Sequence, residues 1–537
     1  MGAKSSGPGE ISPDEPTVTH DEGNQVQSKW KMAKSGDGDT AMALFSDPSE
    51  LHEQYDPKEM RRLLWKIDFM ILPYLAVCYA FFYIDKTTLS YAAIFGIRED
   101  LNLHGTEYNW LSSLFYFGFL AWAFPTNFLL QRLPIGKYLG FNIFMWGVFL
   151  MIQAACHNFA TLAVLRVLSG AAEACSDPAF MLITSMWYTR KEQPVRIGLW
   201  YTANGFGIAL GGLLGYGIGH IRGALPSWKY EFLVIGALCS AWGIVMFIFL
   251  PDSPVTAPGL SKRERRMAVE RLRDNQTGVE NKRLKPYQIK EAFLDYKLYL
   301  FFILGTVCNI PNGGISNFGT IIIKGFGFST LGTTLMQIPY GVIIAISILI
   351  CVYLNDRFEN RRCIFIILFL LPNITGAFGL RYVPLDRKVG RLICYYLTGP
   401  YNAAFVLVLS MQIANTAGHT KKVVTNAVLF LGYCTGNIAG PFFYKSDQSP
   451  TYTLGIWSMI VSHLIEAVVI VTLGLLLRWE NKKRDRIQAQ MEGGLEGRDL
   501  SATAFLDLTD RENLKYVPDF VYIPPVLDAA LLMILEG

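Results

Sequence analysis

The chain has 537 residues, of which 51% are hydrophobic and 17% are charged, whereas about 25% of the residues of an average soluble domain are charged. This composition excludes an ordinary water-soluble enzyme and makes lipid the expected surroundings of most of the chain. The formal net charge of +4 is too small to indicate nucleic-acid binding. We therefore expect the lipid bilayer, and no nucleic acid, as a partner.

Apolar stretches long enough to cross a membrane recur along the whole sequence. A membrane-spanning helix needs roughly 20 mostly apolar residues, because its backbone polar groups must be bonded within the segment. The sequence predicts an all-α membrane protein with twelve transmembrane helices, at residues 67–91, 108–130, 138–156, 159–187, 196–219, 230–250, 299–323, 331–354, 363–380, 390–413, 422–444 and 453–477.

The distribution of Lys and Arg predicts the orientation, since positively charged loops stay on the cytoplasmic side. Alternate loops and the tail segments next to the spans carry 29 of these residues, against nine on the other side, so both termini are expected in the cytoplasm. The long loop after the sixth span divides the chain into two six-helix halves. The predicted parts are a disordered N-terminal tail (1–60), an N-terminal half (61–254), a linker loop (255–297), a C-terminal half (298–480) and a disordered C-terminal tail (481–537).

The two halves resemble each other in their glycines. A shift of 225 residues superposes glycines of the fifth span on glycines of the eleventh. Parallel six-helix repeats are typical of transporters that rock one half against the other, and small residues one turn apart allow close helix packing. We therefore predict helix-packing roles for Gly207, Gly211, Gly215, Gly432, Gly436 and Gly440.

No pattern of soluble enzyme chemistry is present in the sequence. The nine cysteines are scattered singly through apolar stretches, which favours packing roles over a metal site or disulfides. No HExxH motif, phosphate-binding loop or nucleophile elbow occurs. We expect no enzyme activity, no metal and no cofactor.

Charged residues inside predicted spans are costly and are functional candidates by default. The first span carries Asp85 and Lys86, whose side chains point about 100° apart on a helix and can find different partners. The fourth span carries Arg166, Glu173 and Asp177 on one helix stripe. A carboxylate there either pairs permanently with a cation or gains and loses a proton as its surroundings change. We predict proton coupling by Glu173 and Asp85, and substrate binding by Lys86 and Arg166.

Polar residues of other spans complete the candidate site. The run Cys308–Asn317 contains Pro311, two glycines and three asparagines, which predicts a break in the seventh span. Amides exposed at such a break can bind a polar substrate, or the break is a structural kink. Further candidates are Asn204 and Asn426, with interhelical hydrogen bonding as the alternative. The substrate-binding amides are thus predicted to be Asn309, Asn312, Asn204 and Asn426.

Several motifs identify a family resemblance. They are Tyr83-Ile84-Asp85-Lys86, Pro251-Asp252-Ser253-Pro254, Asn309-Ile310-Pro311-Asn312-Gly313-Gly314, and the runs 275–282 and 415–422, the last continuing to Gly440-Pro441. On these motifs the chain resembles the allantoate permease family of fungal transporters, in the anion:cation symporter branch of the major facilitator superfamily.

The resemblance implies a major facilitator fold and a plasma-membrane symporter that imports a small carboxylate, such as allantoate, ureidosuccinate or a dipeptide, together with protons. Lys86 falls where this branch usually has a substrate-binding arginine, and Glu173 where it has the proton-coupling carboxylate. A lysine keeps the charge but loses the bidentate fork, so Arg166 is expected to share the recognition. The alternatives are a symporter for a vitamin-type monocarboxylate (nicotinate, pantothenate, biotin) and a nutrient receptor without transport. No obligate protein partner is expected.

Overall fold

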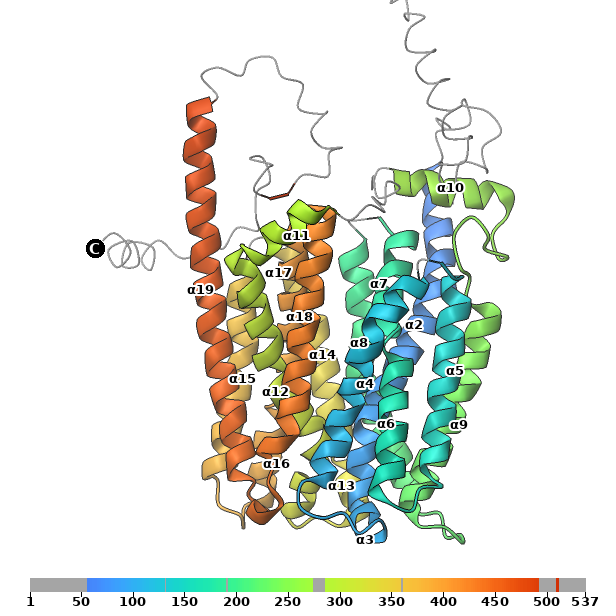
Figure 1. Cartoon of the computed structure of the whole chain (residues 1–537), viewed down its shortest axis with the longest axis vertical. Helices are drawn as coiled ribbons and strands as arrows, with labels where there is room; N and C mark the ends of the chain where they lie inside the picture. Colours follow the sequence, from blue (N-terminus) through green and yellow to red (C-terminus); the bar gives the residue numbers. More distant parts are fainter. Residues whose placement is uncertain are drawn as a thin grey trace, which may run out of the picture.

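A computed structural model of the chain describes residues 56–130, 132–189, 192–273, 285–358, 361–491 and 509–510. Twelve of its helices are long and apolar enough to cross a membrane, and they stand side by side in two groups (Figure 1). This confirms the predicted fold class. Of the predicted tails, residues 1–55, 492–508 and 511–537 lie outside the described residues.

The N-terminal half contains the first six spans. The fourth of them is divided into two helices, and a short α3 (Ile97–Asp100) follows the first. The helices are α2 (Pro57–Ile94), α4 (Glu107–Leu130), α5 (Ile135–Gln153), α6 (Phe159–Glu173), α7 (Ser176–Trp187), α8 (Gln193–Gly219) and α9 (Ser227–Phe249).

The C-terminal half contains the other six spans, two of them divided as well. Its helices are α12 (Tyr296–Gly325), α13 (Thr330–Leu335), α14 (Gln337–Arg357), α15 (Arg362–Tyr382), α16 (Lys388–Tyr396), α17 (Tyr401–Ala414), α18 (His419–Ala439) and α19 (Thr453–Met491), with short 3₁₀ turns η4 (Gly440–Phe443) and η5 (Ser446–Gln448). The linker between the halves forms α10 (Lys262–Arg273) and α11 (Pro286–Phe293).

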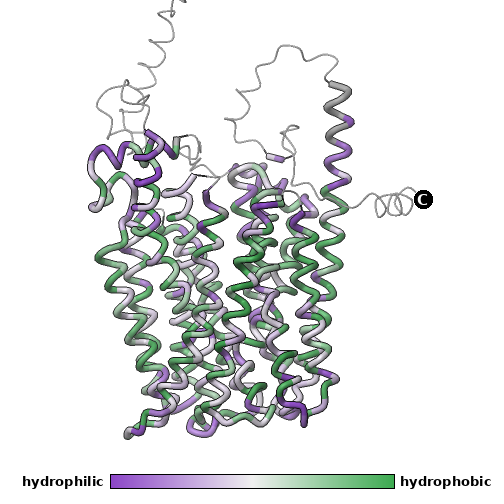
Figure 2. Tube along the Cα trace, turned by 180° about the vertical axis from the view of Figure 1, so that it is seen from behind, coloured by the Kyte–Doolittle hydropathy of each residue, from purple (hydrophilic) through white to green (hydrophobic). Residues whose placement is uncertain are grey.

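We call the side where α2 begins and α19 ends the tail face, and the other side the opposite face. The tail face is uppermost in Figure 1, with α10 and α11 on it. Figure 2 shows apolar residues along the middle of the bundle and polar ones concentrated at its ends, most densely at the tail face. This distribution fits a bundle whose sides lie in hydrocarbon and whose ends lie in water.

Two helices extend further than the hydropathy of the sequence predicts. Helix α2 begins at Pro57, where the Asp56 carboxylate accepts a hydrogen bond from the Lys58 backbone N–H at 3.0 Å and caps the helix. Helix α19 continues to Met491, and Asn481 is buried within it although a disordered tail is expected from that residue. Neither extension is apolar, so a hydropathy criterion does not detect it.

Glycines bring pairs of helices into backbone contact. A Cβ atom added at Gly436 of α18 would lie 2.3 Å from the carbonyl oxygen of Thr306 on α12, and one added at Gly207 of α8 would lie 2.4 Å from that of Ala80 on α2. At Gly215 of α8 the nearest atom would be 3.5 Å away, an ordinary contact. The glycines with predicted packing roles therefore include tightly packed positions and positions that leave room for a methyl group.

The two halves also meet through glycine. A Cβ at Gly205 of α8 would lie 2.3 Å from the Gly341 carbonyl oxygen of α14, and a Cβ at Gly341 would lie 2.4 Å from the Gly205 oxygen. Because small residues let helix backbones approach closely, α8 and α14 are in direct backbone contact between the two halves.

Stability measurements on Gly436→Ala and Gly215→Ala test the role of glycine spacing. We expect Gly436→Ala to lower the free energy of unfolding by about 1–3 kcal/mol, because the methyl group forces α18 away from α12. The matched change at Gly215 should be neutral or stabilising by up to about 1 kcal/mol, since alanine is the better helix former. Thermal unfolding of the two purified variants measures the difference, and equal losses would contradict the packing argument.

Candidate functional site

Asp85 and Lys86 lie in the middle of the bundle and point to different halves. The Asp85 carboxylate, 1% exposed, accepts a hydrogen bond from the Trp146 indole N–H at 3.2 Å within the N-terminal half. The Lys86 ammonium instead donates to the Tyr433 hydroxyl of α18 at 3.0 Å, and lies 4.6 Å from the centre of the Tyr83 ring. Neighbouring residues on one helix thus serve different halves, as their 100° separation allows.

Arg166 is the cation that accompanies Asp85. Its Nη1 atom lies 3.9 Å from the Asp85 carboxylate, its Nε donates to the Leu111 carbonyl at 3.3 Å, and its guanidinium stacks 5.0 Å from the Phe115 ring centre. The side chain is buried inside the N-terminal half. Since Arg166 is held by Asp85 and Leu111, Lys86 is the cation that faces the C-terminal half.

Glu173 is the last residue of α6, directly before a break in the fourth span. Ala174 and Cys175 separate α6 from α7. The carboxyl is 5% exposed, and its Oε2 atom is buried without a hydrogen-bond partner in the structure. A buried carboxyl whose oxygen lacks a donor is easier to protonate than one fixed by hydrogen bonds.

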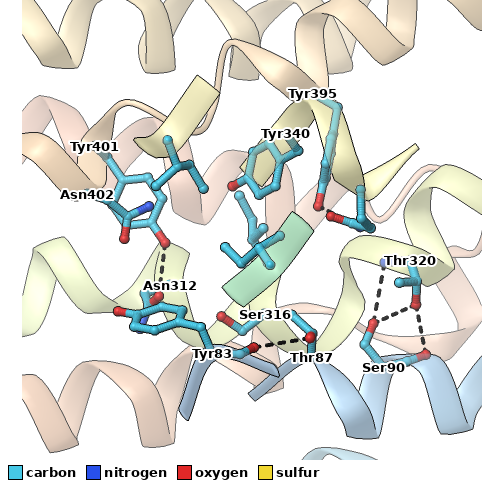
Figure 3. Close-up of a pocket in the computed structure, with 14 residues that line it drawn as sticks. Tyr83, Thr87, Ser90, Asn312, Ser316, Thr320, Tyr340, Tyr395, Tyr401 and Asn402 are labelled. Carbon is cyan, nitrogen blue, oxygen red and sulfur yellow. Dashed lines mark hydrogen bonds between the residues drawn. The ribbon is translucent and has the colours of Figure 1, made fainter. Parts of the chain in front are cut away.

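A cavity lies between the two halves, on the opposite-face side of Lys86. Figure 3 shows that hydroxyl and amide groups from both halves point into it, among them Tyr83 and Thr87 of α2, Ser316 of α12, and Tyr401 and Asn402. The remaining lining is Ser90, Ile208, Asn312, Ile315, Thr320, Gln337, Tyr340, Ile344 and Tyr395. Such a mixture of aromatic walls and fixed polar groups suits a small polar ligand.

The predicted amides occupy different places. Asn312 lines the cavity, accepting from the Tyr401 hydroxyl at 2.9 Å and donating to the Asn437 side chain at 2.9 Å. Asn204 donates to Asn402, a cavity residue, at 3.2 Å and thereby links the halves. Asn309 donates to the Gly305 carbonyl of its own helix at 2.7 Å and does not line the cavity.

Asn426 is exposed and lies outside the cavity as well. It is seven residues before Tyr433 on α18, about 10 Å nearer the tail face. The structure therefore gathers Asn204 and Asn312, but neither Asn309 nor Asn426, around the cavity.

The predicted break of the seventh span is wrong, because α12 is continuous from Tyr296 to Gly325. The Asn309 and Asn317 side chains donate to backbone carbonyls four residues earlier on the same helix, at 2.7 and 2.8 Å. Gly313 serves packing: a Cβ there would lie 2.8 Å from the Asn437 carbonyl oxygen of α18. Pro311 is accommodated within the helix.

Sequence reasoning missed the tyrosines of the site. Tyr433 receives the Lys86 hydrogen bond, and Tyr83, Tyr340, Tyr395 and Tyr401 line the cavity. Tyrosines are common in membrane spans, so nothing in their residue type alone marks them. The available signal was spacing, because Tyr83 precedes Lys86 by one helical turn.

Hydrogen bonds between the halves close the site at the opposite face. The side-chain hydroxyls of Ser90 and Thr320 form a hydrogen bond of 2.6 Å, and the Tyr108 hydroxyl donates to the Asn317 carbonyl at 2.8 Å. Ser113 donates to the Ile438 carbonyl at 2.8 Å, and Lys324 to the Ile94 carbonyl at 3.2 Å. The halves are therefore joined beyond the cavity, on the side away from the tails.

Other ionisable groups lie apart from this site. His463 and Glu466 of α19 form a buried pair at 3.1 Å, with the imidazole ring centre 5.8 Å from that of Tyr401. None of the nine cysteines, all of which lie within the described ranges, forms a disulfide, and eight of them are buried. Within the described ranges, no group of three His, Cys, Asp or Glu side chains could hold a metal ion.

Similarity to known proteins identifies the family of this chain. The family model of the Major Facilitator Superfamily matches residues 75–441. An uncharacterized transporter of Schizosaccharomyces pombe, C757.13, is 40% identical over 463 residues, covering 86% of this chain and 88% of that protein. The allantoate permease of Saccharomyces cerevisiae is 34% identical over 498 residues and 90% of each chain. The thiamine pathway transporter THI73 of the same yeast is 35% identical over 457 residues, 85% of this chain and 86% of its own.

A solved structure shares the fold. It is an inward-facing, unoccupied bacterial homologue of the human lysosomal transporter Spinster, with a TM-score of 0.57 at 13% identity, over 78% of this chain and 97% of that one. Together with the twelve spans and the central site, these similarities show that the chain belongs to the Major Facilitator Superfamily of membrane transporters.

Proposed function

We propose that this transporter is a proton-coupled symporter that imports a small organic anion by alternating access. The observation that carries the proposal is the Lys86 ammonium, which faces the C-terminal half and has the neutral Tyr433 hydroxyl as its hydrogen-bond partner. A carboxylate is a stronger acceptor for an ammonium than a phenol is. An incoming anion can therefore displace Tyr433 and join the two halves through Lys86.

The rest of the substrate would occupy the cavity beside Lys86. Amides of Asn312, Asn402 and Gln337 and the hydroxyls of the lining tyrosines offer donors and acceptors to a polar substrate. The similarity to an allantoate permease supports a small carboxylate as substrate class. The similarity to a thiamine pathway transporter keeps a vitamin-type acid as the second candidate.

Glu173 is the proposed proton carrier. It lies at the α6–α7 break. One oxygen of each carboxylate lacks a hydrogen bond, but Asp85 has the Trp146 indole and the Arg166 guanidinium beside it. An ion-paired carboxylate resists protonation, so the geometry favours Glu173 over Asp85. Arg166 then has the role of holding Asp85, and the substrate contact falls to Lys86.

Orientation follows from the charge distribution. The tail face carries the loops rich in Lys and Arg, which supports a cytoplasmic location of the tail face and of both termini, and a location in the plasma membrane. The inter-half hydrogen bonds at the opposite face then close the site toward the outside of the cell.

Uptake of labelled allantoate, ureidosuccinate, dipeptides, nicotinate, pantothenate and biotin by cells that express the chain tests the proposal. Uptake of one acid that is lost with a protonophore would support proton-coupled import. Background uptake of the whole panel, with the protein present at the cell surface, would contradict this substrate class. Uptake that survives deletion of 1–55 and 485–537 would weaken the receptor alternative.

Substitution of Lys86 should impair recognition of the anion. We expect Lys86→Met to lower Vmax/KM roughly 10- to 100-fold, the effect of losing a hydrogen bond to a charged group, and Lys86→Arg to retain most of the activity. Tyr433→Phe removes the neutral partner of Lys86 and should change Vmax/KM by less than about 10-fold. Kinetics of the acid found in the panel provide the comparison; equal losses in Lys86→Met and Tyr433→Phe would contradict anion binding by Lys86.

Substitution of Glu173 should separate proton coupling from substrate movement. Glu173→Gln cannot release a proton, so net proton-driven uptake should fall to background while exchange of preloaded substrate persists. Glu231→Gln is the matched control, because Glu231 is also fully buried in the N-terminal half but lies on α9, outside the central site. If Glu231→Gln uncouples the transporter and Glu173→Gln does not, the proton carrier is assigned to the wrong residue.

A further inference from the structure

A short segment beyond α19 returns to the bundle and is buried there. Thr509 and Asp510 are 0% and 1% exposed, although the chain leaves α19 at Met491. The two Asp510 carboxylate oxygens lie 2.5 Å from the Lys297 ammonium and 2.6 Å from the Lys421 ammonium. Asp510 thus bridges the beginnings of α12 and α18 at the tail face.

The backbone and neighbouring side chains are shaped to receive this segment. The Thr509 hydroxyl donates to the Glu291 carboxylate of α11 at 3.0 Å. Gly418, which precedes α18, has φ +88°, and a Cβ there would lie 3.1 Å from the Thr509 methyl group. Glycine is required at that position both by its conformation and by the docked threonine.

The charges around Asp510 come from four elements. The Lys421 ammonium is 2.7 Å from the Asp295 carboxylate and 3.0 Å from that of Glu291. The Lys297 ammonium is 3.6 Å from the carboxylates of both Asp295 and Glu480, the latter on α19. Of all these carboxylates, Asp510 makes the shortest contacts to both ammonium groups. The two buried lysines therefore form a binding site for a carboxylate, and the Asp510 carboxylate of the C-terminal segment occupies it.

We propose that the Thr509–Asp510 segment is an intramolecular ligand of the C-terminal half that clamps α11, α12 and α18 together at the tail face. Helix α12 carries Asn312 and Thr320, and α18 carries Tyr433, so both helices have to move together when the halves rock. The clamp fastens their tail-face ends and, through Glu291, the part of the linker that enters the C-terminal half. The clamp does not depend on the proposed substrate; its effect on uptake rests on the proposed function.

The clamp is insensitive to pH near neutrality. Burial raises the pKa of the Asp510 carboxyl, but the ammonium groups of Lys297 and Lys421 lower it by more, and the pKa lies below its ordinary value. A depressed pKa means that the stabilisation is complete above the unfolded-state pKa and is lost only as the pH falls through the folded-state pKa. The segment should therefore remain docked throughout the physiological range.

Limited proteolysis of the full-length chain tests the docking. Trypsin can cut after Arg511, next to the docked residues, and after Arg498, which serves as the internal reference. A protease needs several residues in extended form, so cleavage at Arg511 requires release of Asp510. We expect Asp510→Asn to raise the Arg511/Arg498 cleavage ratio roughly 10-fold, and Asp510→Glu, which keeps the charge, to raise it less. An unchanged ratio in Asp510→Asn overturns the docking.

Thermal unfolding and uptake test the clamp itself. Asp510→Asn should lower the apparent Tm by roughly 3–8 °C, because two buried ammonium groups lose their closest partner, whereas Asp447→Asn, at an exposed aspartate of the opposite face, should leave it unchanged. Vmax should fall at least about fivefold with KM unchanged, since Asp510 does not line the cavity. If Asp510→Asn raises the cleavage ratio but leaves the Tm unchanged, the segment docks without holding α11, α12 and α18 together, and the proposal is overturned. If the wild-type chain transports no compound of the panel, the proposed function fails while cleavage and Tm still decide the clamp.

Discussion

A charged side chain inside a bilayer must find its partners within the protein, and the adjacent pair Asp85 and Lys86 shows how this constraint organises the centre of the molecule. The carboxylate turns into the N-terminal half, where Trp146 and Arg166 receive it. The ammonium turns outward, toward Tyr433 of the other half. One internal cation is thereby neutralised by a fixed partner, and a second is left facing a neutral group. The proposed binding of an anion rests on this asymmetry between the two cations.

The same constraint links recognition to movement. The Lys86–Tyr433 hydrogen bond crosses between the halves, as do the Asn204–Asn402 bond beside it and the Ser90–Thr320 contact beyond the cavity. Opening at the opposite face has to break contacts of this kind, whereas α8 and α14 meet at Gly205 and Gly341 through backbone atoms and small alanine side chains. A ligand that replaces the Tyr433 hydroxyl therefore acts on a bond that the conformational change must also break, which is the differential interaction that any ligand-driven change requires.

The sequence was sufficient for features that hydropathy and charge determine and insufficient for those that packing determines. Twelve spans and the separate partners of Asp85 and Lys86 follow from apolar run length and helical geometry. The continuity of α12 does not, because Pro311, Gly313 and the asparagines indicate a break unless the neighbouring α18 is known to press against Gly313. Asn426 likewise has the residue type of a binding group, but its depth on α18 places it away from the cavity.

The linker between the halves is attached to a different half at each of its two ends. Helix α10 is held to the N-terminal half by Lys66–Glu264 at 2.8 Å and Arg271–Glu192 at 3.2 Å. Helix α11 is held to the C-terminal half, where the Gln288 side chain accepts hydrogen bonds from the backbone N–H groups that begin α18, and Lys421 pairs with Glu291. Each described end of the linker is therefore attached to its own half of the bundle. Because Asp510 binds the same Lys421, the C-terminal segment reinforces one of these attachments, so the end of the chain and its middle are fastened at a single charged cluster.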